Sequence, residues 1–153
     1  THRHNVIAGN VFWAIREAFR KRPCIVYGSD MKVRVEKANV FRYPDVSALC
    51  GTINFYCAEQ DIYCNPQFIC EVLSPSTSRT DRNEKFAKYR LIDTFTEYLI
   101  IEQDKMEVDL HRKGCDGIWT AQTYADINDQ IELESIGVNL TVAEIYEKIE
   151  FDG

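Results

Sequence analysis

Two acidic residues stand in or beside apolar stretches of the sequence. Asp45 follows Pro44 and precedes the run Val46–Cys50, and Glu71 lies within the apolar run Phe68–Leu73. A carboxylate in a buried strand is costly unless it is paired, protonated or bound to a metal. The spacing between the two acids leaves room for two neighbouring strands, so both side chains could converge on one cation. Mg²⁺ or Mn²⁺ suits such oxygen ligands and could activate water beside a phosphate.

Each acid also has a purely structural explanation. Asp45 could be a turn residue, and Glu71 could pair with a buried Arg or Lys. Two acids on adjacent predicted strands strengthen the metal explanation, because functional sites concentrate such groups. From the residues alone both explanations stay open.

The predicted helix that follows Glu71 is rich in cations. They are Arg79, Arg82, Lys85, Lys88 and Arg90. Lys85 lies one turn from Asp81, so the two could form an i,i+4 ion pair on a solvated face. In the alternative interpretation, Lys85 leans toward the carboxylates and positions the attacking water, while the arginines approach phosphates.

Other familiar reaction motifs are missing from the sequence. The histidines His2, His4 and His111 show neither metal-binding spacing nor a catalytic-triad arrangement, and each is expected on a helix or strand surface. No glycine-rich phosphate loop is present either. The candidate catalytic residues are therefore the acids Asp45 and Glu71 and the lysine Lys85.

Composition indicates one globular domain covering residues 1–153. The chain is 45% hydrophobic and 27% charged, with a net charge of −6. That charge counts against broad nucleic-acid binding, which usually leaves a basic footprint. No apolar run is long enough to cross a bilayer and no signal peptide is visible, so we expect a cytoplasmic protein without membrane contact.

The six cysteines include no C-x-x-C pair. Cys24 and Cys70 lie inside apolar runs, where a reduced cysteine acts as a small hydrophobic residue. An even count allows disulfides, but the sequence favours reduced, structural cysteines.

The first half of the chain should provide a helix and four strands. Ile7, Val11, Ile15 and Phe19 recur at helical spacing and predict a helix over 4–20. Strands over 24–27 and 31–35 flank a turn and are expected to form a hairpin. Two further strands are predicted over 41–49 and 67–73, with a loop over 51–65 between them.

The second half should begin with a helix, capped by Ser78 or Thr80, that ends near residue 91. Strands follow over 97–102, 106–110 and 118–124. A capping box at Thr141 and Glu144 predicts a last helix that runs through Ile149. This order indicates an α/β (α+β) protein with a mixed sheet and helices packed on it.

Several of these residues fall in segments that resemble a known family. The segments are His4-Asn5, 29–35, Pro44–Val46, 71–77, Asp81, Glu84-Lys85, Tyr89 and Glu97-Tyr98. They resemble the Uma-two family of putative restriction-endonuclease-like proteins, which belongs to the PD-(D/E)xK nuclease superfamily. The resemblance runs over nearly the whole chain.

The resemblance implies a restriction-endonuclease-like αβββαβ core with a mixed central sheet, helices on its faces, and an added C-terminal β meander and helix. It also implies that Asp45 and Glu71 are metal ligands, with the Val72 carbonyl as a third. The lysine of the (D/E)xK triplet would fall on Leu73. The family is therefore expected to supply its lysine from the next helix, as Lys85, with Lys88 as the fallback.

Two main function hypotheses follow, and hydrolysis of a smaller phosphodiester is a third possibility, since a net acidic protein need not bind a duplex. The first is a Mg²⁺- or Mn²⁺-dependent endonuclease that hydrolyses DNA phosphodiester bonds with Asp45, Glu71 and Lys85. The second is a catalytically inactive nuclease-fold module that binds protein or nucleic acid. The resemblance also suggests a homodimer, and it suggests that an N-terminal segment of the family is absent from this chain.

Overall fold

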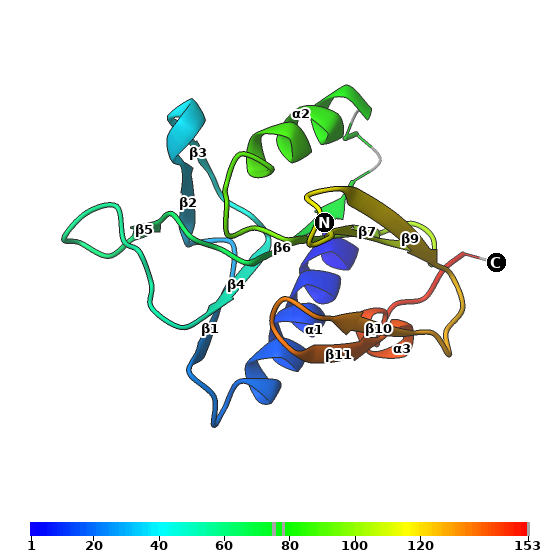
Figure 1. The fold of residues 1–153 in the computed structure, drawn as a ribbon. Helices are drawn as coiled ribbons and strands as arrows, with labels where there is room; N and C mark the ends of the chain where they lie inside the picture. The colour runs from blue at the N-terminus through cyan, green and yellow to red at the C-terminus, as the bar shows by residue number, and fades with distance from the viewer. Residues whose placement is uncertain (75, 78, 153) are drawn as a thin grey trace.

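A mixed sheet of six strands forms the centre of the protein (Figure 1). The structure is a computed structural model, and it describes residues 1–74, 76–77 and 79–152. The strand order in this central sheet is β1-β4-β6-β7-β8-β9. The strands are β1 (Cys24–Tyr27), β4 (Val46–Cys50), β6 (Phe68–Leu73), β7 (Glu97–Glu102), β8 (Val108–Lys113) and β9 (Trp119–Tyr124). Strands β6 and β7 run parallel, and the other neighbours are antiparallel.

One face of the central sheet is covered by α1 (His2–Ala18), which lies across it in Figure 1. Ile7, Val11 and Ile15 form the buried stripe of α1, and Thr1 caps its first turn. The hairpin of β10 (Gln130–Leu133) and β11 (Val138–Thr141), followed by α3 (Val142–Ile145), shares the same apolar core.

The opposite face carries α2 (Arg79–Tyr89) and a small second sheet, which we call the side sheet. The side sheet consists of β2 (Lys32–Val35), β3 (Val40–Arg42) and β5 (Ile62–Tyr63), with the short 3₁₀ helix η1 (Glu36–Ala38) between β2 and β3. Apolar residues of the side sheet and α2 pack together in a second core. The central sheet is therefore buried on both faces.

The predicted α+β architecture with a mixed sheet and helices on its faces is confirmed, but the predicted β1–β2 hairpin is wrong. Strand β1 pairs with β4 in the central sheet, whereas β2 pairs with β3 and β5 in the side sheet. The reason lies in burial: Val26 of β1 packs in the core under α1, while Val33 and Val35 of β2 pack in the core under α2.

Other boundaries also differ from the sequence prediction. The strand expected over 41–49 is split into β3 and β4, because Pro44 lacks the N–H that a continuous strand requires. The capping box at Thr141 and Glu144 is confirmed, but α3 ends at Ile145, and Lys148 beyond it takes a left-handed backbone conformation. Of the two caps expected for α2, Ser78 lies outside the described residues, and Thr80 lies within the helix.

The expectation of reduced cysteines is wrong for one pair. Cys24 and Cys50 face each other in the β1–β4 ladder and form a disulfide. Cys70 is free and fully buried, as its apolar neighbours suggested. Among the described residues, no helix combines the length and the apolar character that crossing a membrane would require.

Candidate functional site

The pairing of β4 with β6 brings the two predicted acids together. Val46 of β4 lies opposite Cys70 of β6 in an antiparallel ladder. One step further along both chains, Asp45 therefore lies opposite Glu71. Residues opposite each other in such a ladder have Cβ atoms about 5 Å apart. The register thus explains why these acids meet although they are distant in sequence.

Asp45 is held by donors from two different elements. Its Oδ2 atom accepts a hydrogen bond from the backbone N–H of Val72, at 2.8 Å, and lies 3.1 Å from Nε2 of His4 in α1. The His4 contact requires a proton on Nε2, since a carboxylate oxygen is an acceptor. Together these donors fix the orientation of the Asp45 carboxylate.

Glu71 is the most buried acid of the site, with only 4% of its surface exposed. The Tyr89 hydroxyl donates a hydrogen bond of 2.9 Å to its Oε1 atom. The Nζ atom of Lys85 lies 3.5 Å from the same oxygen. Tyr89 and Lys85 are one helical turn apart, so a single face of α2 presents both groups to Glu71.

The environment of Glu71 works against its ionisation. The pKa of Glu71 is raised to about 7, chiefly by burial; the Lys85 ammonium and the Tyr89 hydrogen bond oppose this rise, and the Asp45 carboxylate adds to it. Burial also raises the pKa of Tyr89, so its hydroxyl stays protonated as a donor. At neutral pH Glu71 is therefore only partly ionised, and Lys85 is the cation beside it.

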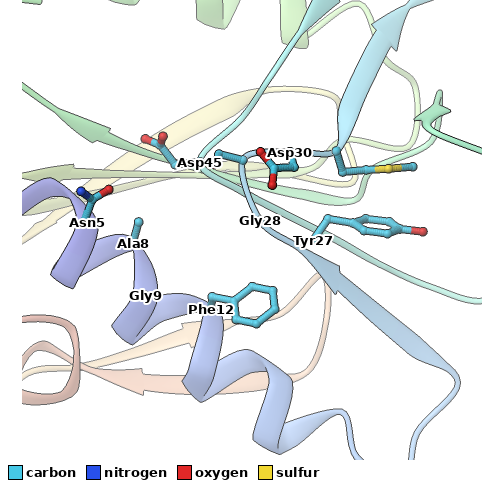
Figure 2. Close-up of a pocket in the computed structure, with 10 residues that line it drawn as sticks. Asn5, Ala8, Gly9, Phe12, Tyr27, Gly28, Asp30 and Asp45 are labelled. Carbon is cyan, nitrogen blue, oxygen red and sulfur yellow. The ribbon is translucent and has the colours of Figure 1, made fainter.

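Two cavities adjoin these residues. One, with a volume of about 590 Å³, lies between α1 and the turn at Gly28 and Asp30, and Asp45 lines it (Figure 2). In Figure 2, Asp45 lies across from Asn5 and Ala8 of α1, on the side toward Asp30. The second, which we call the Lys85 cleft, has a volume of about 390 Å³. It is lined by Arg42, Ser76, Thr77, Asp81, Glu84 and Lys85.

The remaining predicted residues lie in different places. Asp81 lines the Lys85 cleft, and Arg82 is 3.4 Å from Glu102 rather than beside the acids. Lys88, the fallback lysine, is half-buried on α2 and has no ion pair with Asp45 or Glu71 in the described part of the chain. Val72 contacts Asp45 through its N–H, and its carbonyl stays a predicted ligand only.

Three residues of the site were missed by sequence reasoning. His4 was expected on a helix surface, yet it contacts Asp45. Its position one turn before Ile7, on the buried stripe of α1, could have indicated this. Tyr89 was one of the residues that carry the family resemblance but was given no role, although its spacing from Lys85 places both on one face of α2. Arg42 reaches the Lys85 cleft because it alternates with the exposed Phe41 along β3.

Two curated relatives show similarity along most of the chain. The uncharacterized protein slr1290 of Synechocystis is 34% identical over 128 residues, which cover 84% of this chain and 66% of that protein. The uncharacterized protein sll1609 of the same organism is 31% identical over 129 residues, which cover 84% of this chain and 73% of that protein. The chain thus spans just under two thirds of the first relative's length.

A solved structure shows the same fold. The crystal structure of a putative nuclease belonging to DUF820 from Anabaena variabilis superposes with a TM-score of 0.77, covering 94% of this chain and 79% of that one. At 14% identity this similarity establishes the fold alone. The family model described as putative restriction endonuclease matches residues 1–143. The chain therefore belongs to the Uma2 (Uma-two) family of putative restriction endonucleases.

Proposed function

We propose that this protein is a metal-dependent endonuclease that hydrolyses DNA phosphodiester bonds through Asp45, Glu71 and Lys85. One observation carries the proposal: Glu71 is buried opposite Asp45 and has an ammonium group 3.5 Å from its Oε1 atom. Two carboxylates and an amine at one point form the set of groups expected of a PD-(D/E)xK nuclease. Family membership supports the same reaction class.

The two carboxylates Asp45 and Glu71 suit Mg²⁺ or Mn²⁺, which keep water ligands. They suit less well a metal whose ligands are all protein side chains. Among the described residues, no group of three or more His, Cys, Asp and Glu side chains is arranged to hold an ion. Mg²⁺ is commonly bound by one or two carboxylates and keeps several waters, which Asp45 and Glu71 allow. When bound, such an ion would lower the pKa of a water ligand and stabilise charge on the phosphate.

The protein groups have separate tasks in this proposal. Asp45 presents an oriented carboxylate, because Val72 and His4 hold its Oδ2 atom. Tyr89 and Lys85 favour the ionised form of Glu71 that a cation requires. The Lys85 ammonium also reaches the open cleft, where it can donate hydrogen bonds to the attacking water and to a phosphate oxygen.

We also propose a homodimer in the cytoplasm, where the Cys24–Cys50 disulfide would be an exception to the usual reduced state of cysteines. Each copy carries one Asp45–Glu71 pair among its described residues, so a dimer would bring two cleavage sites to the same DNA. Sedimentation of the purified protein with and without DNA tests this assembly, and a monomer under both conditions would rule it out.

Metal binding and cleavage can be tested separately. We expect Glu71→Ala to lose Mn²⁺ binding in calorimetry while its circular dichroism stays native, because one of two anionic ligands is gone. We expect Asp45→Ala to lose nicking of supercoiled plasmid in the presence of Mn²⁺. Glu17→Ala is the matched control, since Glu17 lies exposed on α1, outside the site.

Unchanged Mn²⁺ affinity in Glu71→Ala would remove Glu71 from the metal site. A wild-type protein that binds Mn²⁺ but leaves plasmid, linear duplex and single strands intact would contradict the nuclease proposal.

That second result would favour a binding module, the alternative function. Two observations support it: Leu73 occupies the usual lysine position, and the rim of the Lys85 cleft mixes Arg42 and Lys85 with Asp81 and Glu84. A mixed rim holds phosphates less strongly than a purely basic one. The module would retain DNA or protein binding after Asp45→Ala, whereas cleavage would be absent from the wild type.

A further inference from the structure

The outer face of the side sheet exposes aromatic rings beside cations. Phe41, Tyr43 and Tyr56 have 38%, 56% and 49% of their surfaces exposed. The Nζ atom of Lys32 lies 5.9 Å from the centre of the Phe41 ring and 5.3 Å from that of Tyr43. We call Lys32, Arg34, Phe41, Tyr43 and Tyr56 the aromatic face.

Strand alternation explains why these side chains share one side. Along β2, Val33 and Val35 are buried in the core, so Lys32 and Arg34 lie on the opposite side of the strand, although only 19% of the Arg34 side chain is exposed. Phe41 of β3 lies opposite Arg34 in the ladder, and Tyr43 follows it two residues later on the same side. Four of the five members are thus positioned by paired strands or directly after one.

The fifth member, Tyr56, completes the face from the loop before β5. Its ring packs edge-on against Phe41, with ring centres 5.7 Å apart, and the Arg34 guanidinium lies 4.6 Å from its centre. Glu36 lies 3.6 Å from Arg34 and offsets part of its charge. Lys32 is therefore the main electrostatic element of the face.

The face is continuous in sequence with the proposed nuclease site. Only Pro44 separates Tyr43 from Asp45, and Arg42 between Phe41 and Tyr43 points to the other side, into the Lys85 cleft. A strand of nucleic acid whose bases lie on Tyr43 would therefore have its phosphates near Asp45. Exposed aromatic rings next to cations are how proteins bind single strands, because every base offers a surface for stacking.

We propose that the aromatic face binds the unpaired bases of single-stranded DNA and leads the strand to the Asp45–Glu71 site. This inference rests on the proposed nuclease function and adds the substrate class to it. A duplex fits less well, because its bases are already stacked and the face has few cations for a second strand.

The test measures binding apart from cleavage. A fluorescein-labelled oligothymidylate is titrated with protein in EDTA, and its anisotropy is recorded. We expect Tyr43→Ala and Tyr56→Ala each to weaken binding about tenfold, the effect of losing one stacking contact. Tyr43→Phe should bind like the wild type, since the ring is kept. Lys32→Gln should weaken binding and reduce the dependence of log K on log[salt] by about 0.7.

Controls use residues outside both regions. Trp13→Ala removes an aromatic side chain with 63% of its surface exposed on α1, and Lys21→Ala removes an exposed cation. Both should bind the oligonucleotide like the wild type. A duplex of the same length and an RNA strand are titrated in parallel, and the DNA single strand should bind at least tenfold tighter than the duplex.

The outcomes separate this inference from the proposed function. If the wild type cleaves DNA but Tyr43→Ala and Tyr56→Ala bind the oligonucleotide as tightly as it does, the aromatic face does not bind single strands. The nuclease proposal would then still stand. Tight single-strand binding that these variants lose, without any cleavage, would support the face and contradict the nuclease. Stronger binding of duplex or RNA, or a dimer that Tyr43→Ala dissociates while DNA binding persists, would overturn the proposed substrate.

Discussion

Glu71 shows how far a single residue can be interpreted from sequence. An acid within the apolar run Phe68–Leu73 is costly to bury, and that cost alone indicated a special site. Its partners were harder to find. Lys85 follows from the helical pattern, but the contact of His4 with Asp45 joins the first helix to a strand edge forty-one residues later. The helical stripe shared with Ile7 turns His4 toward the core, but the residue that it meets there depends on packing between distant segments.

The buried carboxyl should make stability depend on pH. Burial raises the pKa of Glu71 from 4.5 to about 7, so the folded protein holds this proton more tightly than the unfolded chain. Its contribution to stability is therefore complete below pH 4.5 and is lost as the pH rises through 7. The loss amounts to about 3 kcal/mol for a shift of this size.

Urea denaturation between pH 4.5 and 8, without metal, measures this effect as the difference between wild type and Glu71→Gln. The glutamine keeps an acceptor for Tyr89 but cannot ionise. Wild type should lose stability relative to the variant across this range, and saturating Mn²⁺ at pH 8 should restore part of it. Parallel curves for the two proteins would show that Glu71 ionises as easily in the folded state as in the unfolded chain.

At the scale of elements, helix α2 supplies the lysine that strand β6 lacks. In a (D/E)xK triplet the lysine stands two residues after the acid on the same strand, and here that position is Leu73. Leu73 is buried in the core under α2 on the same face as Glu71. Lys85 reaches Glu71 from α2 instead. The amine therefore enters the site from the helix that covers the strand.

This arrangement predicts a rescue between elements. We expect Lys85→Ala to reduce plasmid cleavage by a hundredfold or more, because the ammonium beside Glu71 is lost. Lys88→Ala, which removes a neighbouring lysine on α2, should change the rate less than threefold. Adding Leu73→Lys to Lys85→Ala should recover at least tenfold, since the new amine starts from the same face of β6.

Initial rates of nicking at saturating Mn²⁺ measure all four proteins, with thermal denaturation to correct for the cost of burying a lysine at position 73. A Lys88→Ala variant weaker than Lys85→Ala would reassign the amine. If the folded Leu73→Lys/Lys85→Ala variant recovers no nicking activity, the lysine must stand at its position on α2 for cleavage.

The elements also mark the limit of sequence prediction. Period and turn signals located α1, α2, β1 and the strands around Glu71, because each depends on residues close in sequence. The same signals implied a β1–β2 hairpin across Gly28 that does not form. A turn indicates that the chain reverses, but the sheet that a strand joins depends on which core accepts its apolar side, as Val26 and Val33 show.

At the scale of the whole molecule, the protein is acidic, and the Asp45–Glu71 pair belongs to the central sheet between the two hydrophobic cores. The net charge of −6 argued against nucleic-acid binding, yet Arg42 and Lys85 both line the cleft beside Glu71. These two cations make the cleft less acidic than the chain as a whole, as the proposed nuclease function requires. Both hydrophobic cores matter for the site, because they pack on β4 and β6, and the register of these two strands brings Asp45 and Glu71 together.

The Cys24–Cys50 disulfide ties the edge strand β1 to β4, the strand that begins after Asp45, and should stabilise the whole fold. A link between residues 26 positions apart restricts the unfolded chain and contributes about 3 kcal/mol. We expect the Cys24→Ala/Cys50→Ala double variant to unfold at roughly 1–2 M less urea than wild type. Reducing agent should shift wild type to the same midpoint and leave the variant unchanged, while Cys115→Ser, which removes an exposed free thiol, should behave as wild type. A wild-type midpoint that ignores reducing agent would show that the two thiols are not joined, and that the ladder of β1 and β4 alone holds this edge.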